Sequence, residues 1–253
     1  MSAFVTGEGL AACCRHVFDG TLTAQPEATE DWWFCKLDHL EEFVDGSAPR
    51  RPFVLVTHNS DYPVDLRYRR LLRSRRIRTW FAANVALEHR KLVPLPLGIA
   101  NPHWAHGNPA SLRAAQVASR RKSILVDVSF SLATNSGGRQ YCLEQTGLEL
   151  APRLAHPDYL QRLASSYFCV SPSGHGIDTH RTWEALYVRT VPIVTRSRLT
   201  DEYGDLPWIV LEDWSQFRSL ELSPVLYGRL MSGWDPAAMS LEALVDRMRR
   251  RLG

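Results

Sequence analysis

Apolar runs of strand length alternate with helix-like segments along the first half of the chain. Continuous apolar runs lie at residues 53–57, 77–85 and 91–101, and the segments 30–46 and 64–75 beside them are predicted to be helical. Apolar strands separated by helices are typical of parallel sheets that are covered on both faces. The pattern therefore predicts an α/β fold.

The second half repeats this alternation after a polar, helix-prone segment at 110–121. Strands are expected at 122–130, 167–173, 190–195 and 207–214, and helices at 134–146, 156–166, 178–187 and 240–253. Two such modules in succession predict two Rossmann-like halves, residues 1–118 and 119–253, with a cleft between them. We expect the last helix to pack back on the first half, and Trp32 and Trp33 to pack the first helix onto its sheet.

Composition narrows the class of protein. The chain has 253 residues, of which 45% are hydrophobic and 23% charged, as is ordinary for a globular protein. No apolar run approaches the roughly 18 residues of a membrane span, and the first residues lack the pattern of a secretory signal. Five cysteines without repeated CxxC spacing argue against a disulfide framework or a zinc ribbon. The sequence predicts a cytoplasmic protein.

The net charge of +3 is unevenly spread, because seven arginines fall within the twelve residues Arg67–Arg78. At helical spacing Leu71 and Leu72 would face inward and most of the arginines would face solvent. One interpretation is a plain solvated helix face. The other is a patch for an anionic partner, such as an anionic membrane surface. No aromatic interleaving or reader motif favours nucleic acid.

The segment "SPSGHGIDTHRTWEALYVRTVPIV", residues 171–194, predicts a small-residue loop that leads from one strand into a helix. Ligands of α/β sheets bind at the carboxyl ends of strands, where such a loop would lie. The glycines Gly174 and Gly176 would turn backbone N–H groups toward a ligand, and Arg181 would lie on the first helical turn. These features suit a diphosphate, and Glu184 could accept hydrogen bonds from vicinal hydroxyls.

A plainer interpretation of the same segment stays open. Asp178 would cap the helix and Arg181 would pair with Glu184. Thr179 stands where a dinucleotide-binding fingerprint has its third glycine, which disfavours NAD.

Residues 159–194 and 206–217 resemble the C-terminal part of exostosin-like glycosyltransferases. The shared features are the strand and small-residue loop, an Arg-x-x-Glu-Ala-Leu helix, a Pro-Ile-Val strand, and Leu-Pro followed by Trp-x-x-Phe. The loop "THNSD" and the segment "LPLGIAN" match more loosely. The resemblance implies a GT-B arrangement, transfer of a sugar from a nucleotide-sugar with inversion, and no cofactor or bound metal. The chain is short for such a transferase, which leaves the completeness of its acceptor site open.

The resemblance assigns the donor site to the second half. It implies that Arg181 contacts the diphosphate and Glu184 the ribose, and that the phosphate turn is lined by Ser171, Ser173, Gly174 and Gly176. His175, between the glycines, would contact the donor, Asp178 would lie beside it, and Arg139 could reach the diphosphate from the other side.

An inverting transfer needs a general base within reach of the acceptor hydroxyl. His58 and Asp61 follow a predicted strand, and the carboxylate could orient the imidazole. Asn59 and Ser60 could bind acceptor hydroxyls, although an Asx-turn would explain the same residues. His106 is assigned to an acceptor loop, because no third ligand accompanies it and His103 in a metal site.

The sequence thus predicts a metal-independent inverting glycosyltransferase. It would use a nucleotide-sugar, most often a UDP-sugar in this family, and a saccharide or lipid-linked glycan acceptor, with peripheral contact between Arg67–Arg78 and an anionic membrane. The alternatives are a non-catalytic nucleotide- or glycan-binding module and a nucleic-acid-binding protein that uses the arginine segment.

Overall fold

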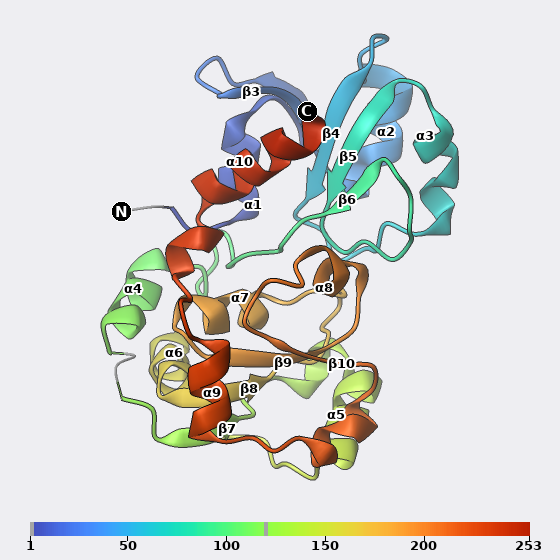
Figure 1. Ribbon diagram of the computed structural model, residues 1–253. Coiled ribbons are helices and arrows are strands. Elements are labelled where there is room, and N and C mark those ends of the chain that lie inside the picture. Colours follow the sequence, from blue (N-terminus) through green and yellow to red (C-terminus); the bar gives the residue numbers. More distant parts are fainter. Residues whose placement is uncertain (1–2, 119–120) are drawn as a thin grey trace.

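A computed structural model describes residues 3–118 and 121–253 and shows a mixed α/β fold with two sheets, one in each half of the chain (Figure 1). The first sheet has the order β2-β1-β3-β4-β5-β6, and the second the order β10-β9-β8-β7. Within both sheets every pair is parallel except that of β1 with β2. The parallel α/β character predicted from the apolar runs is confirmed.

The first sheet is built from β1 (Cys14–Phe18), β2 (Leu22–Ala24), β3 (Glu30–Lys36), β4 (Phe53–His58), β5 (Ile77–Ala82) and β6 (Leu92–Pro94). The strands expected at 53–57, 77–85 and 91–101 are confirmed as β4, β5 and the short β6. The helix expected over 30–46 is wrong in its first part, because β3 occupies Glu30–Lys36. Trp32 and Trp33 therefore lie on this strand and not on a helix.

The alternation of β3 explains the difference. Trp32 and Phe34 pack in the core under α1 (Gly7–Cys13) and α10 (Leu241–Leu252), whereas Trp33 and Cys35 pack in the core on the opposite face of the sheet. A strand buried on both faces reads as one apolar run, without a polar face to show its period. Helical structure begins at the next residue, with a 3-10 turn (Leu37–His39), α2 (Leu40–Glu42) and a π-turn (Phe43–Ser47).

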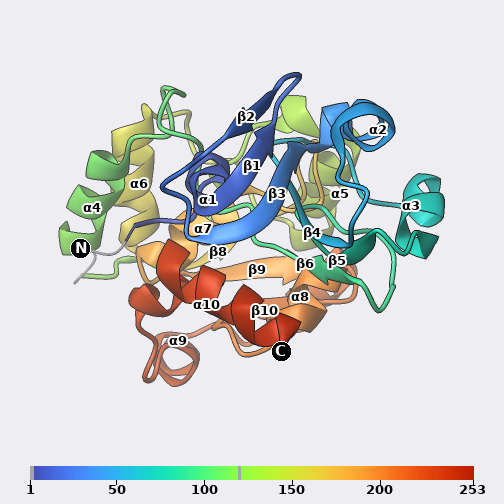
Figure 2. The same ribbon diagram turned by 90° about the horizontal axis from the view of Figure 1, so that it is seen from above.

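Helices cover both faces of the first sheet (Figure 2). The helical segment 37–47 and α3 (Arg69–Arg73) cover one face, and α3 is preceded by a 3-10 turn (Leu66–Tyr68). The other face packs against α1 and the C-terminal helix α10, through Leu244, Val245 and Met248. The chain thus returns to its N-terminal half at its end.

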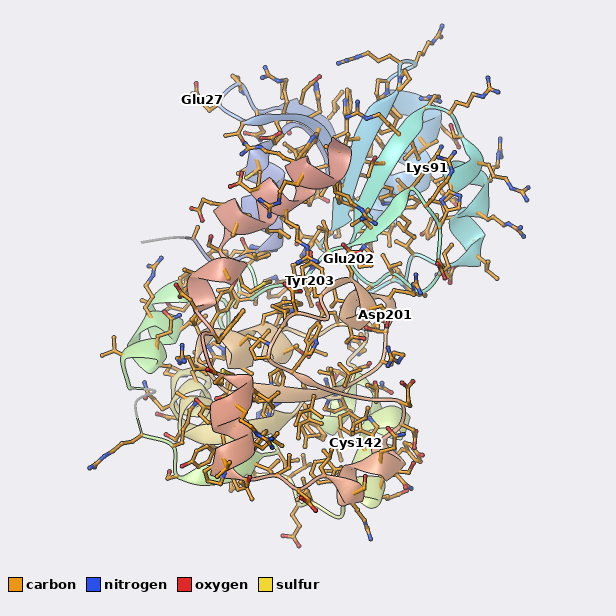
Figure 3. The ribbon with its side chains drawn as sticks, viewed as in Figure 1. Glu27, Lys91, Cys142, Asp201, Glu202 and Tyr203 are labelled. Carbon is orange, nitrogen blue, oxygen red and sulfur yellow. The ribbon has the colours of Figure 1, made fainter. Side chains whose placement is uncertain are left out.

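The second sheet contains β7 (Ile124–Asp127), β8 (Ser166–Val170), β9 (Val191–Thr195) and β10 (Ile209–Leu211). One face is covered by α4 (Pro109–Ala118), α6 (His156–Ala164) and α7 (His180–Tyr187), and the other by α5 (Ser136–Thr146) and α9 (Pro224–Leu230). These elements confirm the strand and helix assignments made for the second half. The short helix α8 (Arg198–Glu202) lies against β6, and its end, with Glu202 and Tyr203, stands between the halves (Figure 3).

The loops at the carboxyl ends of the two sheets meet each other. Asn84, after β5, donates to the Ser60 carbonyl at 3.0 Å and accepts the Asp178 N–H at 3.0 Å. The Leu97 N–H, after β6, donates to Asp178 Oδ2 at 2.8 Å. Apart from the antiparallel edge strand β2, the strands of both sheets follow chain order, so the parallel strands have no reversal point of the kind that commonly places a ligand in doubly wound folds. The junction of the two carboxyl ends is therefore the place where a ligand site is expected.

Candidate functional site

A cavity of about 320 Å³ opens at this junction, outside the carboxyl ends of β1, β3 and β4. Lys36 and His58, which end β3 and β4 and pair in register, stand on one side of it, and His180 of α7 contributes from the other half. Its remaining polar lining is Asp19, Asn59, Ser60, Asp61, Asn101 and His103, with Trp104 as an aromatic wall. The structure thus brings together four of the residues predicted for the acceptor side, His58 through Asp61.

His58 occupies the floor of the cavity with both ring nitrogens engaged. It is 2% exposed, with Nε2 3.2 Å from the Pro96 carbonyl and Nδ1 3.3 Å from Asn59 Oδ1. Burial lowers the pKa of His58 to about 4, against the opposing effect of these two contacts. Since a carbonyl can only accept, Nε2 carries the proton of the neutral ring. The unprotonated Nδ1 is covered by Asn59 Oδ1 and Gly7, so it is not placed to deprotonate an acceptor.

A directed chain of hydrogen bonds holds this arrangement. The Glu8 N–H donates to Asn101 Oδ1 at 2.9 Å, and Asn101 Nδ2 donates to Asn59 Oδ1 at 3.0 Å. A backbone N–H can only donate, so it fixes the orientation of both amides and turns an oxygen toward His58. Asn59 adopts a left-handed φ of 58°, a conformation that Asn tolerates.

The expected pairing of Asp61 with His58 is wrong. Asp61 is exposed at the cavity rim, and its carboxylate lies 3.6 Å from Nδ1 of His175. The exposed loop positions of both residues allow this pairing, whereas His58 is turned inward to Pro96. His175 thus faces the first half and not a donor in the second.

His180 contributes an unprotonated ring nitrogen to the cavity. Its Nδ1 lies 2.8 Å from the Gly98 carbonyl, which can only accept, so Nδ1 carries the proton. Nε2 is then the unprotonated nitrogen, and it has no hydrogen-bond partner anywhere in residues 3–118 and 121–253. No motif in the sequence marks this residue as functional, and its contact with Gly98 could not be read from a pattern.

His106, assigned to the acceptor loop, lies beside the cavity and not in its lining. Its ring is 6.4 Å from that of His180 and stacks on exposed Trp104 at 6.2 Å. Burial, followed by the charge of His180, lowers the pKa of His106. No group of three or more His, Cys, Asp or Glu side chains that could hold a metal ion occurs among the described residues.

The loop after β8 is closed on itself. Ser171 Oγ lies 2.9 Å from Thr182 Oγ1 and 3.2 Å from Thr179 Oγ1, and Ser173 Oγ donates to the Ile177 carbonyl at 3.0 Å. The space between this loop and residues 194–208 is about 20 Å³, which is room for about one water molecule. The hydroxyls of Ser171 and Ser173 are therefore used internally.

The two glycines of this loop face different neighbours. A Cβ at Gly176 would lie 2.7 Å from Asn84 Nδ2, so this glycine allows the halves to approach each other. A Cβ at Gly174 would lie 3.2 Å from Arg139 Nη2 and 3.8 Å from Thr134 Oγ1. Only Gly174 is beside a cationic group.

Asp178 ties the loop to both halves. Besides Leu97, its carboxylate accepts from the Thr179 N–H at 2.7 Å and from Trp183 Nε1 at 2.6 Å. Burial raises the pKa of Asp178 to about 6, although these donors favour the carboxylate. The expectation that Asp178 caps the helix is wrong, because Thr179 is the N-cap residue of α7 and receives no side-chain cap.

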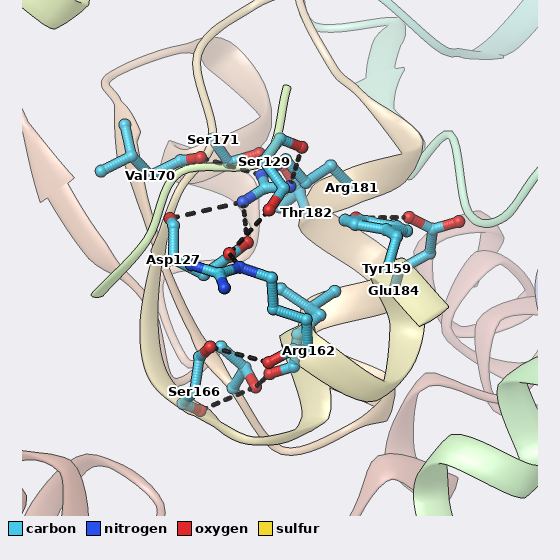
Figure 4. Close-up of polar contacts among 12 residues, drawn as sticks. Asp127, Ser129, Tyr159, Arg162, Ser166, Val170, Ser171, Arg181, Thr182 and Glu184 are labelled. Carbon is cyan, nitrogen blue, oxygen red and sulfur yellow. Dashed lines mark hydrogen bonds and ion pairs between the residues drawn. The ribbon is translucent and has the colours of Figure 1, made fainter. Parts of the chain in front are cut away.

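Arg181 is buried in an ion-pair network (Figure 4). Its Nη2 lies 2.6 Å from Asp127 Oδ2 at the end of β7, its Nε donates to the Val170 carbonyl at 2.9 Å, and Nη1 donates to the Ser129 carbonyl. Arg162 Nε donates to the other Asp127 oxygen at 2.7 Å. Burial alone would raise the pKa of Asp127, but the charge of Arg181 and the hydrogen bonds outweigh it and lower this pKa.

The carboxylate of Glu184 also contacts residues of the second half. His156 Nε2 lies 3.0 Å from one oxygen and Tyr159 Oη donates to the other at 2.9 Å, both from α6. Arg181 and Glu184 therefore do not pair with each other, which corrects the plainer interpretation of this helix. In this structure both residues hold α6, α7 and β7 together, and neither presents its charge to a ligand.

Arg139 is a buried cation without a counter-charge. It is 7% exposed on the first turn of α5, and its Nε donates to the Ser173 carbonyl at 3.0 Å and Nη1 to the Ser131 carbonyl. No carboxylate pairs with it in the described part of the chain, and burial, reinforced by the charge of Arg181, lowers its pKa. The buried hydroxyl oxygen of Thr134, near Gly174, has no hydrogen-bond partner in the described residues.

Comparisons with known proteins add no identification: no protein-family model matches the chain, and no curated protein matches its sequence. Sequence reasoning missed two polar residues of the cavity, Lys36 and His180. Assigning β3 correctly would have aligned Lys36 with His58 at the same edge of the sheet.

The Asp127–Arg181 pair yields a stability prediction. Removing one partner of a buried ion pair leaves an uncompensated charge, so Arg181→Ala should lower the free energy of unfolding by about 3–5 kcal/mol. The double variant with Asp127→Ala should cost less than the sum of the two single variants. Urea unfolding measures both.

The control is Arg196→Ala, which breaks exposed ion pairs with Asp201 and Glu212 and should cost about 0–1 kcal/mol. Equal losses in Arg181→Ala and Arg196→Ala would contradict the structural role of Arg181.

His58 yields a pH prediction. Its pKa falls from 6.5 to about 4 on folding, so the unfolded state binds more protons between these values. Stability is therefore lost as pH falls from 6.5 toward 4, by at most about 3 kcal/mol from this group. His58→Gln, which can still donate to Pro96 but cannot titrate, should flatten this part of the pH profile of the unfolding free energy.

His175→Gln, at an exposed histidine, should leave that profile unchanged. A His58→Gln profile parallel to that of the wild type would show that His58 does not titrate with folding.

Proposed function

We propose that this protein is an inverting glycosyltransferase of the exostosin-like kind, with its two α/β halves in a GT-B arrangement. Two features support the proposal: both sheets are almost wholly parallel, and the loops at their carboxyl ends face each other. The carboxyl ends of parallel strands are where α/β folds bind ligands. In this proposal the donor binds on the second half and the acceptor in the cavity of the first.

The observation that carries the proposal is the unpaired, buried guanidinium of Arg139. Burying a charge without a partner is costly, and a bound anion would supply the missing charge. The first turn of α5 adds to it, because a helix N-terminus attracts anions and a Cβ at Gly137 would meet no atom within 4 Å. Arg139, this turn and Gly174 then hold the diphosphate of the nucleotide-sugar.

This proposal moves the diphosphate contact from Arg181 to Arg139. Arg181 already has Asp127 as its counter-charge, whereas Arg139 has none. Arg181 and Glu184 become positioning residues that fix α7, whose N-terminus carries His180 into the cavity.

The cavity suits a saccharide acceptor. Trp104 is exposed and offers an apolar face to a sugar ring, and Lys36, Asp61 and Asn101 offer groups for its hydroxyls. In the transfer step the acceptor oxygen bonds to the anomeric carbon as the bond from that carbon to the diphosphate oxygen breaks. The nucleoside diphosphate leaves with the bonding electrons, and the acceptor proton passes to Nε2 of His180.

A ligand panel tests the donor site. Melting temperatures would be measured with UDP, GDP, CMP, ADP and NAD for the wild type and for Arg139→Gln. One nucleoside diphosphate should stabilise the wild type, by about 2.7 kcal/mol at 100 times its dissociation constant. Arg139→Gln should lose most of this stabilisation, because the anion loses its buried counter-charge.

The matched control is Arg153→Gln, at an exposed arginine without an ion pair in the described residues, which should keep the full effect. Stabilisation by NAD alone, or by no ligand, would refute the transferase proposal.

The proton acceptor is tested by His180→Asn. The Asn amide can keep the hydrogen bond to the Gly98 carbonyl but has no basic nitrogen at the position of Nε2. The assay supplies sugar conjugates of the nucleoside diphosphate that the panel identifies, with p-nitrophenyl monosaccharides or water as the acceptor of the sugar. The rate at which the nucleoside diphosphate is released should fall about 10²–10⁴-fold. The thermal shift with that nucleotide should remain.

Turnover of His180→Asn within twofold of the wild type would remove His180 from the mechanism without affecting the donor site.

A further inference from the structure

We propose that one flank of the N-terminal half docks on an anionic lipid bilayer. This basic flank is the stretch that leaves the cavity rim and continues through α3, and it is defined by Tyr62, Leu66, Arg69, Arg70, Arg73 and Arg75. In two perpendicular views α3 lies at the outer edge of the N-terminal half, away from the second sheet (Figures 1 and 2). The proposal concerns binding to a surface and does not depend on the proposed transferase activity.

The charge of the basic flank is not neutralised within the protein. Arg69, Arg70, Arg73 and Arg75 are exposed, and none has an ion-pair partner among residues 3–118 and 121–253. Arg67 is different, because Asp65 holds its Nε at 3.0 Å and so takes up one charge. Four guanidinium groups without an ion-pair partner in the described residues therefore follow one another along residues 69–75.

Two apolar side chains protrude beside these arginines. Leu66 is 71% exposed and Tyr62 is 56% exposed, whereas Leu72, two turns further on, is buried and anchors α3 on the sheet. Exposed apolar residues next to cations are the arrangement by which peripheral proteins enter the headgroup region of a bilayer. The exposed Leu66 gains little on a nucleic acid, whose phosphates bind cations, whereas the headgroup region of a bilayer removes its apolar surface from water.

The position of the basic flank sets which part of the molecule would face the lipid. Tyr62 follows Asp61, which lines the cavity, so a docked bilayer would lie next to the cavity rim. A membrane-bound molecule could then reach the cavity without leaving the bilayer. The partner is identified by its chemistry as a bilayer that contains anionic headgroups.

The test is sedimentation of the full-length protein with vesicles of phosphatidylcholine containing 30% phosphatidylglycerol, compared with vesicles of pure phosphatidylcholine. We expect binding to the anionic vesicles that weakens with salt, and at least tenfold weaker partitioning to the neutral ones. The variant Arg69→Gln, Arg70→Gln, Arg73→Gln, Arg75→Gln should bind roughly 600-fold less, since each of the four arginines near the surface contributes about fivefold. Leu66→Ser with Tyr62→Ser should weaken binding about tenfold or more at unchanged charge.

The matched control changes the same charge elsewhere: Arg121→Gln, Arg153→Gln, Arg229→Gln, Arg250→Gln, at exposed arginines outside the basic flank. It should bind anionic vesicles as the wild type does. Absence of wild-type binding, equal loss in the control, or equal binding to neutral vesicles would each overturn the proposal. So would tighter binding to a 30-base-pair DNA duplex than to the anionic vesicles. Each variant's melting temperature, within about 3 °C of the wild type, shows that it is folded.

Discussion

The junction at Asp178 is the constraint on which the arrangement of both halves depends. Its carboxylate accepts the Leu97 N–H from the first half and the Trp183 and Thr179 donors from the second, while its own N–H is held by Asn84. A buried carboxylate with donors from both halves fixes their relative positions more tightly than apolar contact, which has no direction. The position of α7 then follows, and with it the position of His180 over the cavity.

The two buried arginines of the second half differ in whether a carboxylate pairs with them. Arg181 and Arg139 are almost equally buried and both donate to backbone carbonyls near the β8 loop. Asp127 balances the first and nothing in the described chain balances the second. A charge that is already neutralised gains little from an added anion, whereas an unbalanced one gains the interaction that its burial removed. This asymmetry is the physical basis for assigning the anion to Arg139.

Sequence reasoning predicted correctly those elements that are determined by their own residues. It missed contacts that depend on a residue far away in the chain. The strand β4 was predictable because Phe53 to Thr57 are apolar or small and buried on both faces. The strand β3 was not, since Trp32 to Cys35 form one apolar run without alternation, and only Lys36 separates this run from the helical segment that begins at Leu37. Placing Arg181 on the first turn of a helix was correct. Its partner Asp127 lies 54 positions earlier in the chain, and no spacing rule links the two. His58 was rightly placed at a strand end near the junction, but its hydrogen bond to the Pro96 carbonyl could only be found in three dimensions.

His58 and His180 differ in the surroundings of their second ring nitrogen. Both line the same cavity, and each has one ring nitrogen bound to a backbone carbonyl, which fixes the proton there. In His58 the second nitrogen meets Asn59 Oδ1, whose orientation is set by the Glu8 N–H two side chains away. Neutral His58 therefore cannot satisfy both contacts, and a proton that would satisfy them is opposed by burial. In His180 the second nitrogen is unopposed. Of these two histidines, His58 is fixed in the fold by both ring nitrogens, and His180 keeps one nitrogen without a hydrogen-bond partner in the described residues. That nitrogen is the group which the proposed transfer assigns to the acceptor proton.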